Sequence, residues 1–239
     1  MSRERPGFGE PRYHHELIDS TNERARELVE EGAASGTVVT AAEQSAGRGR
    51  HGRHWTAPAG KALLFSAILR PLSIRHRLLP LAVPLAVAEA AEAVGAGECG
   101  VKWPNDVWIG ERKLAGVLIE ARPPEWAVIG VGLNVAIGPD EFPEELRDTA
   151  TSIGGGADVE AAFAALCEAL DRWVGAEDDT VLAEFRRRDA LAGREIGWTG
   201  AGEGSGLVEG VDADGNLVVR LADGDRTALG SGEVHLKLD

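Results

Sequence analysis

The sequence predicts a chain in which helices and strands are mixed up to about residue 190, followed by a small β-barrel. In the first part, segments with apolar residues at helical spacing alternate with β-branched or apolar runs. Beyond Leu191, short β-type runs alternate with Gly- and Asp-rich turns, a pattern typical of a small barrel. With 239 residues, of which 44% are apolar, the chain can bury one full core and a small second one.

The N-terminal elements are predicted from their boundary residues. Ser20 and Glu23 have the spacing of a capping box, so we expect a helix that begins there and ends near Gly32. The β-branched run at 37–41 predicts a strand, and the apolar run at 63–69 predicts a buried strand. A loop rich in Gly and Arg connects the two strands.

Three more helices and a strand pair follow. Residues 78–94 are rich in Leu, Ala and Val and predict a packed helix, although two prolines leave its first residue open. The apolar runs 114–121 and 127–135 flank an Arg-Pro-Pro-Glu turn and predict an antiparallel hairpin in a buried sheet. Helices are predicted at about 159–174 and about 179–189. The predicted barrel strands are 194–198, 206–211, 217–221, 226–229 and 233–238.

Composition narrows the class of protein. The formal net charge of −14 argues against nucleic-acid binding, which usually needs a basic surface. Cys99 and Cys167 form no CxxC pair, so we expect a reducing compartment, no disulfide framework and no structural zinc site. No apolar run approaches the ~20 residues that span a bilayer, and the polar N-terminus does not resemble a signal peptide. We therefore expect a cytoplasmic protein that binds neither nucleic acid nor a membrane.

The most informative segment is the run Gly-Arg-Gly-Arg-His-Gly-Arg-His-Trp at residues 47–55, hereafter the Arg loop. Arg presents paired donors to carboxylate or phosphate oxygens, and Gly lets the backbone approach an anion closely. Trp adds a flat face for stacking. One interpretation is a mobile loop that closes over a small phosphorylated or adenylated ligand. The other is a solvated basic turn that binds nucleic acid, and the run alone leaves both open.

Three further motifs are weak when taken singly. Residues 102–106 (Lys-Trp-Pro-Asn-Asp) gather an ammonium, an amide and a carboxylate around a turn, or form only a surface turn with a half-buried Trp. Lys113, at a strand entry before Gly116, can place its charge on a phosphate or simply cover apolar surface. Glycines inside the strand at 130–135 indicate close approach of a ligand or of another backbone, or merely close sheet packing.

In combination these motifs are specific. They occur in the order 20–22 (Ser-Thr-Asn), Gln44, 47–55, 102–106, 113–116 and 130–134. Over nearly its whole length the chain thereby resembles the biotin–protein ligases, also called biotin–[acetyl-CoA-carboxylase] ligases. The resemblance implies an α+β fold with a mixed β-sheet catalytic domain, related to class II aminoacyl-tRNA synthetases, over residues 1–190. It also implies a small SH3-like β-barrel over residues 191–239.

The resemblance implies an ATP-dependent ligase. Such an enzyme joins the carboxylate of biotin to the α-phosphate of ATP, which gives biotinyl-5′-AMP and pyrophosphate. It then transfers biotin to a specific lysine of a biotin carboxyl carrier protein or domain of acetyl-CoA carboxylase. Mg²⁺ is expected with ATP, although the sequence offers no metal cluster and no residue is assigned as a metal ligand.

The resemblance also assigns residues by position. The implied catalytic residues are Arg50, Lys113 and Asp106, of which Asp106 would orient or deprotonate the carrier lysine. The implied biotin-binding residues are Ser20, Thr21, Asn22, Gln44, Arg48, Gly49, Arg50, Lys113 and Gly116. The implied nucleotide-binding residues are Arg48, Arg50, Trp55, Asn105, Asn134 and Lys237.

Two features depart from the family pattern. His51 stands where the family often has another Arg, and an imidazole is mostly uncharged at pH 7, so we expect adenylate retention to depend on pH. The sixteen residues before Leu17 are too few for a helix-turn-helix, so we expect a ligase without the DNA-binding arm of some relatives.

The sequence argues against three other functions. A lipoate or octanoate ligase or transferase of the same superfamily would not be expected to carry the Arg loop together with residues 102–106, and a non-catalytic biotin or nucleotide sensor need not retain both this loop and Lys113. A nucleic-acid binder is disfavoured by the net charge of −14. The oligomeric state is open, and a homodimer is one possibility because exposed sheet edges can pair.

Overall fold

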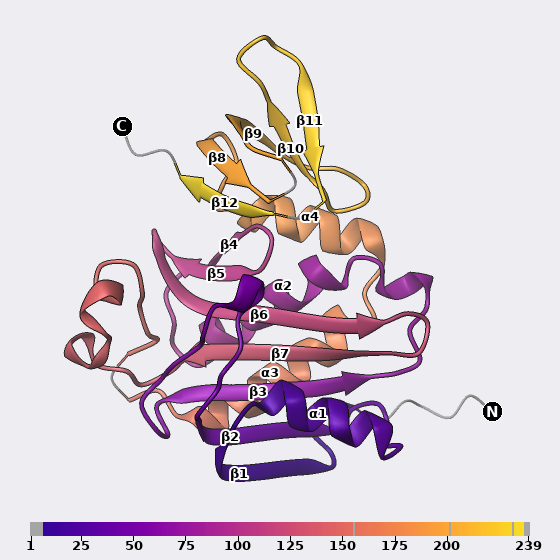
Figure 1. Cartoon of the computed structure of the whole chain (residues 1–239), viewed down its shortest axis with the longest axis vertical. Helices are drawn as coiled ribbons and strands as arrows, with labels where there is room; N and C mark the ends of the chain where they lie inside the picture. Colours follow the sequence, from indigo (N-terminus) through magenta and orange to yellow (C-terminus); the bar gives the residue numbers. More distant parts are fainter. Residues whose placement is uncertain (1–6, 155, 201, 231, 237–239) are drawn as a thin grey trace.

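The computed structural model describes residues 7–154, 156–200, 202–230 and 232–236. Figure 1 shows a large sheet crossed by helices and a smaller sheet stacked above it. The helices are α1 (Thr21–Glu30), α2 (Leu79–Ala93), α3 (Val159–Trp173) and α4 (Asp178–Arg188), and short 3-10 turns lie at Arg50–Gly52, Ile74–His76, Pro139–Glu141 and Glu144–Leu146. No helix among the described residues is both long and apolar enough to cross a membrane.

The large sheet has seven strands in the order β1-β2-β3-β7-β6-β5-β4. Its first two strands pair in parallel and all other neighbours pair antiparallel. The strands are β1 (Arg12–Ile18), β2 (Val38–Gln44), β3 (Ala62–Leu69), β4 (Gly100–Lys102), β5 (Asp106–Ile109), β6 (Arg112–Arg122) and β7 (Trp126–Asn134). The mixed sheet and the β6–β7 hairpin confirm the predicted α+β class.

Strand β3 explains how the sheet is covered on both faces. All eight of its residues are buried. Phe65 and Leu69 belong to the main core with the residues of α2 and α3, whereas Ile68 packs in a separate cluster with Leu28 of α1. Alternate side chains therefore point to opposite covered faces, which is why this strand is a continuous apolar run. In Figure 1, α1 lies across one face of the sheet and α2 and α3 lie behind it.

The second sheet is antiparallel, in the order β11-β10-β9-β8-β12. Its strands are β8 (Glu195–Thr199), β9 (Gly204–Val211), β10 (Leu217–Arg220), β11 (Arg226–Leu229) and β12 (Glu233–Leu236). The predicted Asp-Gly turns at 214–216 and 223–225 do join neighbouring strands of this sheet. The first of them contacts the part of the chain that carries the large sheet, because Trp103 Nε1 donates to the carbonyl oxygen of Gly215 at 3.1 Å and Arg77 Nη1 to that of Ala213 at 2.8 Å.

The structure corrects several predicted details. The capping box is wrong: the Ser20 side chain makes no capping hydrogen bond, and the Glu23 carboxylate pairs with Arg26 and Arg48 instead. Strands β1, β4 and β5 were not predicted. Helix α2 begins at Leu79, which places Pro80 in the first turn, where a missing N–H breaks no intrahelical bond.

Candidate functional site

A cavity of about 550 Å³ lies on the sheet face that α1 covers. Within the part of the chain that the structure describes, every residue predicted for the site lines this cavity: Ser20, Thr21, Asn22, Gln44, Arg48, Gly49, Arg50, Trp55, Asn105, Asp106, Lys113, Gly116 and Asn134. Lys237 lies outside the described residues. Segments that are far apart in the sequence therefore line one cavity.

The floor of the cavity consists of uncharged donors and acceptors at the start of α1. Ser20, Thr21 and Asn22 are all buried. The backbone N–H and the hydroxyl of Thr21 both donate to Gln44 Oε1, at 2.8 and 3.1 Å. Ser66 Oγ, which the sequence analysis did not single out, lies 2.8 Å from Thr21 Oγ1 and 2.6 Å from Asn22 Oδ1. A chain of hydrogen bonds thus fixes the orientation of Gln44, Thr21, Ser66 and Asn22 before any ligand arrives.

Glycines in β6 and β7 make room for side chains that lie flat on the sheet. A Cβ at Gly130 would come within 2.1 Å of Asn22 Oδ1, and one at Gly132 within 2.4 Å of Trp55 Cε2. A Cβ at Gly116 would also approach the Trp55 ring, at 3.1 Å. The glycine pattern predicted close approach by a ligand or another backbone. The structure shows that an amide and an indole ring occupy these positions.

The Arg loop forms a closed hairpin. The backbone N–H of Trp55 donates to Gly47 O at 3.0 Å, and that of Gly49 to Arg53 O at 2.7 Å. A bridge between Arg48 and His54 lies between these two hydrogen bonds. At the tip, His51 adopts φ 55°, ψ 35°, a left-handed conformation that is uncommon for a residue with a side chain.

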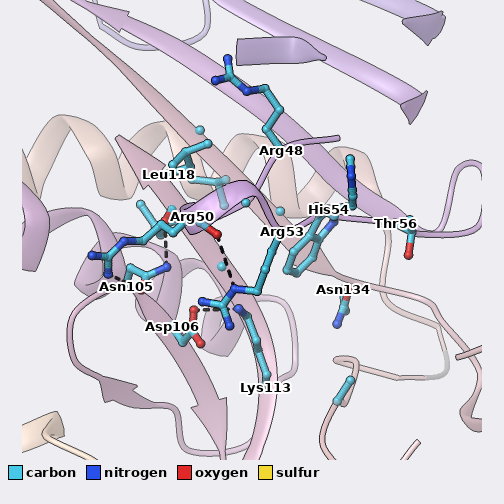
Figure 2. A pocket seen from close by; sticks show the side chains of 18 of the residues that line it. Arg48, Arg50, Arg53, His54, Thr56, Asn105, Asp106, Lys113, Leu118 and Asn134 are labelled. Atoms are coloured by element: carbon cyan, nitrogen blue, oxygen red, sulfur yellow. Dashed lines mark hydrogen bonds and ion pairs between the residues drawn. The ribbon is translucent and has the colours of Figure 1, made fainter. Parts of the chain in front are cut away.

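The arginines of the loop extend in different directions. Arg48 Nη1 lies 3.1 Å from Glu23 Oε2 and 3.3 Å from Glu120 Oε1. Arg50 Nη1 donates to Asn105 Oδ1 at 3.0 Å. In Figure 2, Arg48 points away from Asp106 and Lys113, whereas Arg53, a lining residue that the sequence analysis missed, extends toward them.

Strands β5 and β6 hold an ion pair at the cavity wall. Lys113 Nζ lies 2.8 Å from Asp106 Oδ1, and the two side chains are 33% and 17% exposed. The same ammonium sits 5.6 Å from the centre of the Trp55 ring. The Lys113 backbone is fixed on both sides, because its N–H donates to Thr149 O at 2.7 Å and its carbonyl accepts from Thr151 N at 2.8 Å.

The turn between β4 and β5 carries Asn105 to the cavity. Its Nδ2 donates to Val117 O at 3.0 Å, and the Val117 N–H donates back to Asn105 O at 2.9 Å. Trp103 of the same turn is 2% exposed and points instead toward the second sheet, so the half-buried Trp of the simpler interpretation is wrong. The other side of the cavity includes Asn134, whose Nδ2 donates to Thr151 O at 2.9 Å.

The second sheet also reaches the cavity, through His235 of β12. No sequence signal marked this histidine, whereas Arg53 belongs to the Arg loop and could have been included. Among the described residues, no group of three or more His, Cys, Asp or Glu could hold a metal ion. Burial raises the pKa of Cys99 and of Cys167 to about 12, so neither thiol is a ready nucleophile at neutral pH.

Models of known protein families match two parts of the chain, one for each sheet. Residues 15–134 match the model of the Biotin/lipoate A/B protein ligase family, and residues 193–237 match the Biotin protein ligase C terminal domain. A biotin--[acetyl-CoA-carboxylase] ligase of Paracoccus denitrificans is 36% identical over 220 residues, which cover 84% of this chain and 91% of that protein. The Bifunctional ligase/repressor BirA of Bacillus subtilis is 37% identical over 156 residues, 63% of this chain and 48% of that protein. The chain thus matches about half the length of that relative.

Solved structures are similar over almost the full chain. The biotin protein ligase from Aquifex aeolicus in complex with biotin and ATP superposes with a TM-score of 0.80 and 30% identity, covering 96% of this chain and 100% of that one. The biotin protein ligase from Leishmania major in complex with biotinyl-5-AMP gives a TM-score of 0.64 and 25% identity, covering 93% and 99%. With its two matched domains and its 36% identity to most of the Paracoccus denitrificans protein, this chain belongs to the Biotin/lipoate A/B protein ligase family.

Proposed function

We propose that this chain is a biotin–protein ligase that makes biotinyl-5′-AMP from biotin and ATP and transfers the biotinyl group to a carrier lysine. The observation that carries the proposal is the single cavity that joins an uncharged polar floor to a cationic wall. The floor suits a neutral head group and the wall suits phosphates. The similar Aquifex aeolicus structure, which holds biotin and ATP, supports the same pairing of ligands.

The floor would hold biotin by its ureido head. That head both donates and accepts hydrogen bonds, as do the Ser20, Thr21, Asn22 and Gln44 side chains around it. Gly116 lets side chains lie close to the backbone of the sheet, because a Cβ there would come within 3.1 Å of the Trp55 ring and 3.2 Å of Lys113. Arg48 and Gly49 line the same cavity at the beginning of the Arg loop.

In the first step, a carboxylate oxygen of biotin bonds to the α-phosphorus of ATP while the bond from that phosphorus to the bridging oxygen breaks, releasing pyrophosphate. Both reactants are anions, so positive charge must offset their repulsion. Arg50 and Lys113 would supply it, because both line the cavity on fixed elements. The Mg²⁺ expected with ATP would be held mainly by its phosphates, since the described residues build no metal cluster.

The nucleotide would lie along the remaining wall. Trp55 offers an aromatic face for the adenine, and Asn105 and Asn134 offer amide groups beside it. The role of Lys237 stays a prediction, because this residue is not among the described ones.

In the second step, the amine of the carrier lysine attacks the acyl carbon and AMP leaves. The attacking amine must first lose a proton. Asp106 already binds one lysine ammonium, that of Lys113, at 2.8 Å. A second lysine that enters the cavity would find the same carboxylate, which can orient it or accept its proton. The proposed partner is a biotin carboxyl carrier protein or domain, and the proposed domain boundary lies between residues 190 and 191.

The test is biotin-dependent exchange of radiolabelled pyrophosphate into ATP, repeated with lipoate in place of biotin. We expect exchange with biotin only. An acceptor domain is then added, and a mass gain of one biotinyl group on a single lysine is expected. Exchange with lipoate alone would identify a lipoate ligase. Tight biotin binding without exchange would identify a sensor, and either result would contradict the proposal.

A further inference from the structure

Glu120 of β6 connects the floor of the cavity with the Arg loop. Its Oε2 accepts a hydrogen bond from Asn22 Nδ2 at 2.9 Å. Its Oε1 lies 3.3 Å from Arg48 Nη1. The Glu120 side chain is 22% exposed, so one partly exposed carboxylate contacts both the floor of the cavity and the Arg loop.

The Asn22 side chain is thereby fixed at both ends. Its amide nitrogen donates to Glu120, and its Oδ1 lies 2.6 Å from Ser66 Oγ. The same nitrogen also donates to Leu118 O at 3.4 Å, and both the carboxylate and this carbonyl can only accept, so together they direct the amide nitrogen of Asn22 toward β6. Glu120, as the shorter contact, contributes to the orientation of this floor residue.

The Arg48 side chain is held by two carboxylates. Glu23 Oε2 of α1 lies 3.1 Å from the same Nη1 atom that Glu120 contacts, and Arg26 shares both carboxylates, at 3.2 and 3.8 Å. Arg48 also forms the backbone bridge with His54 at the base of the Arg loop. Holding the Arg48 side chain therefore fixes the base of the loop whose tip carries Arg50.

We propose that Glu120 is a positioning residue that fixes the Asn22 amide and the base of the Arg loop together. The structural part of this inference stands on the contacts alone. Its consequence, that Glu120 slows the escape of biotinyl-5′-AMP, rests on the proposed ligase function. In this arrangement Arg48 anchors the loop, whereas Arg50 donates to Asn105 and Arg53 extends toward Asp106 and Lys113.

Two variants separate the two contacts. Glu120→Gln keeps a carbonyl oxygen for Asn22 but removes the charge that attracts Arg48. Glu120→Leu removes both. The matched control is Glu209→Gln in β9, because Glu209 also accepts from two arginines, Arg220 at 3.0 Å and Arg226 at 2.6 Å, and its side chain is 25% exposed. Glu209 does not line the cavity.

The first measurement is the rate at which trypsin cleaves the ligand-free protein within the Arg loop. Glu120→Gln should raise this rate about fivefold, the upper range for one exposed ion pair, and Glu209→Gln should leave it unchanged. Glu120→Leu should in addition weaken biotin binding about tenfold, as expected when a charged hydrogen bond is lost, whereas Glu120→Gln should not. A cleavage rate in Glu120→Gln within about twofold of wild type, or an equal rise in the control, would overturn the inference.

The second measurement follows dissociation of preformed biotinyl-5′-AMP. Glu120→Gln should raise the dissociation rate of biotinyl-5′-AMP about fivefold and leave the KM for biotin unchanged. General destabilisation of the fold would not change one of these quantities without the other. Unchanged dissociation would overturn the proposed role in retention. If wild type releases no pyrophosphate with biotin and ATP, the ligase proposal fails instead, while the proteolysis result still tests whether Glu120 holds the loop.

Discussion

Arg188 and Arg48 each meet two carboxylates, yet their settings differ. Arg188, the last residue of α4, is 10% exposed in its side chain and donates to both oxygens of Glu92, at 2.6 and 2.9 Å. It also donates to Glu184 at 2.7 Å and to Cys99 O at 3.0 Å. Arg48 is 43% exposed and meets its carboxylates through one nitrogen.

The difference concerns what each cluster can still do. The planar guanidinium of Arg188 donates to partners on α2, on α4 and before β4. It therefore holds these elements together. The Arg loop instead lines a cavity and presents its arginines on a short hairpin. Removing the cation of the Arg188 cluster should therefore lower the free energy of unfolding. Removing a cation near Arg48 should instead impair the activation or retention of a ligand.

The largest effect is expected at the cavity wall. Lys113→Ala should lower biotin-dependent pyrophosphate release by about 10²–10³-fold, the range seen when one preorganised charge-stabilising donor is lost. The melting temperature should change little, because Lys113 is 33% exposed. Single-turnover pyrophosphate release measures the step directly. Lys61→Ala, which changes a lysine outside the cavity, is the control, and a wild-type rate in Lys113→Ala would remove this residue from the first step.

The reverse pattern is expected at α4. Arg188→Ala should reduce the free energy of unfolding by about 3 kcal/mol, because it leaves carboxylates without their partner at a largely buried position. Arg187→Ala on the same helix changes a 56% exposed arginine and should cost at most about 1 kcal/mol. Urea unfolding of both variants gives the comparison. Equal losses would show that burial does not separate the two arginines.

A smaller effect is expected from Arg50→Gly. Loss of a charged donor beside Asn105 should speed the escape of biotinyl-5′-AMP about tenfold. Escaped adenylate reacts with any exposed amine, so labelling of bystander lysines should rise, which mass spectrometry of a mixed protein sample can detect. Arg122→Gly, at a 70% exposed position, is the control. Labelling that stays confined to the carrier would contradict the role given to Arg50.

The smallest effect concerns acid stability. Hydrogen bonds from Arg187 and then Arg188 lower the pKa of Glu184 to about 2. A carboxyl with a lowered folded pKa stabilises the protein above its unfolded pKa of about 4.3. That contribution is lost as the pH falls toward 2. Urea midpoints measured between these pH values should fall with pH, and they should fall less steeply in Arg187→Ala. Parallel slopes would show that this pair does not contribute.

Much of the fold followed from periodicity. The buried hairpin β6–β7 and the helices α3 and α4 have the apolar spacing that their burial requires. Strand β1 has the sequence RYHHELI and lies at the sheet edge, where only one neighbour pairs with it, so no apolar run marks it. Strands β4 and β5 have only three and four residues, too few for a period to appear.

The sequence motifs supplied residues that line the cavity, whose binding and catalytic roles stay predictions, but they did not supply the contacts between these residues. The motifs contain the polar residues that line the cavity, because binding groups are concentrated in short segments near strand ends. The partners of Arg48 were not predictable, since Glu23 on a helix and Glu120 near a strand end have the pattern of solvated surface residues. The Ser20 cap failed for a related reason: the Glu23 side chain that would complete it is engaged by Arg48 and Arg26.

The strand order of the large sheet has a consequence for how this protein is synthesised. Strand β3 pairs with β7, so that Ala62 lies opposite Asn134, and β4 to β6 emerge from the ribosome before β7. Until β7 appears, the apolar residues of β3 lack one of their two neighbours. Contacts of such long sequence separation form slowly and leave apolar edges open to aggregation meanwhile. The glycines that make room for Asn22 and Trp55 lie on β6 and β7, so the cavity is completed late. An incompletely folded chain therefore has no formed cavity for a ligand.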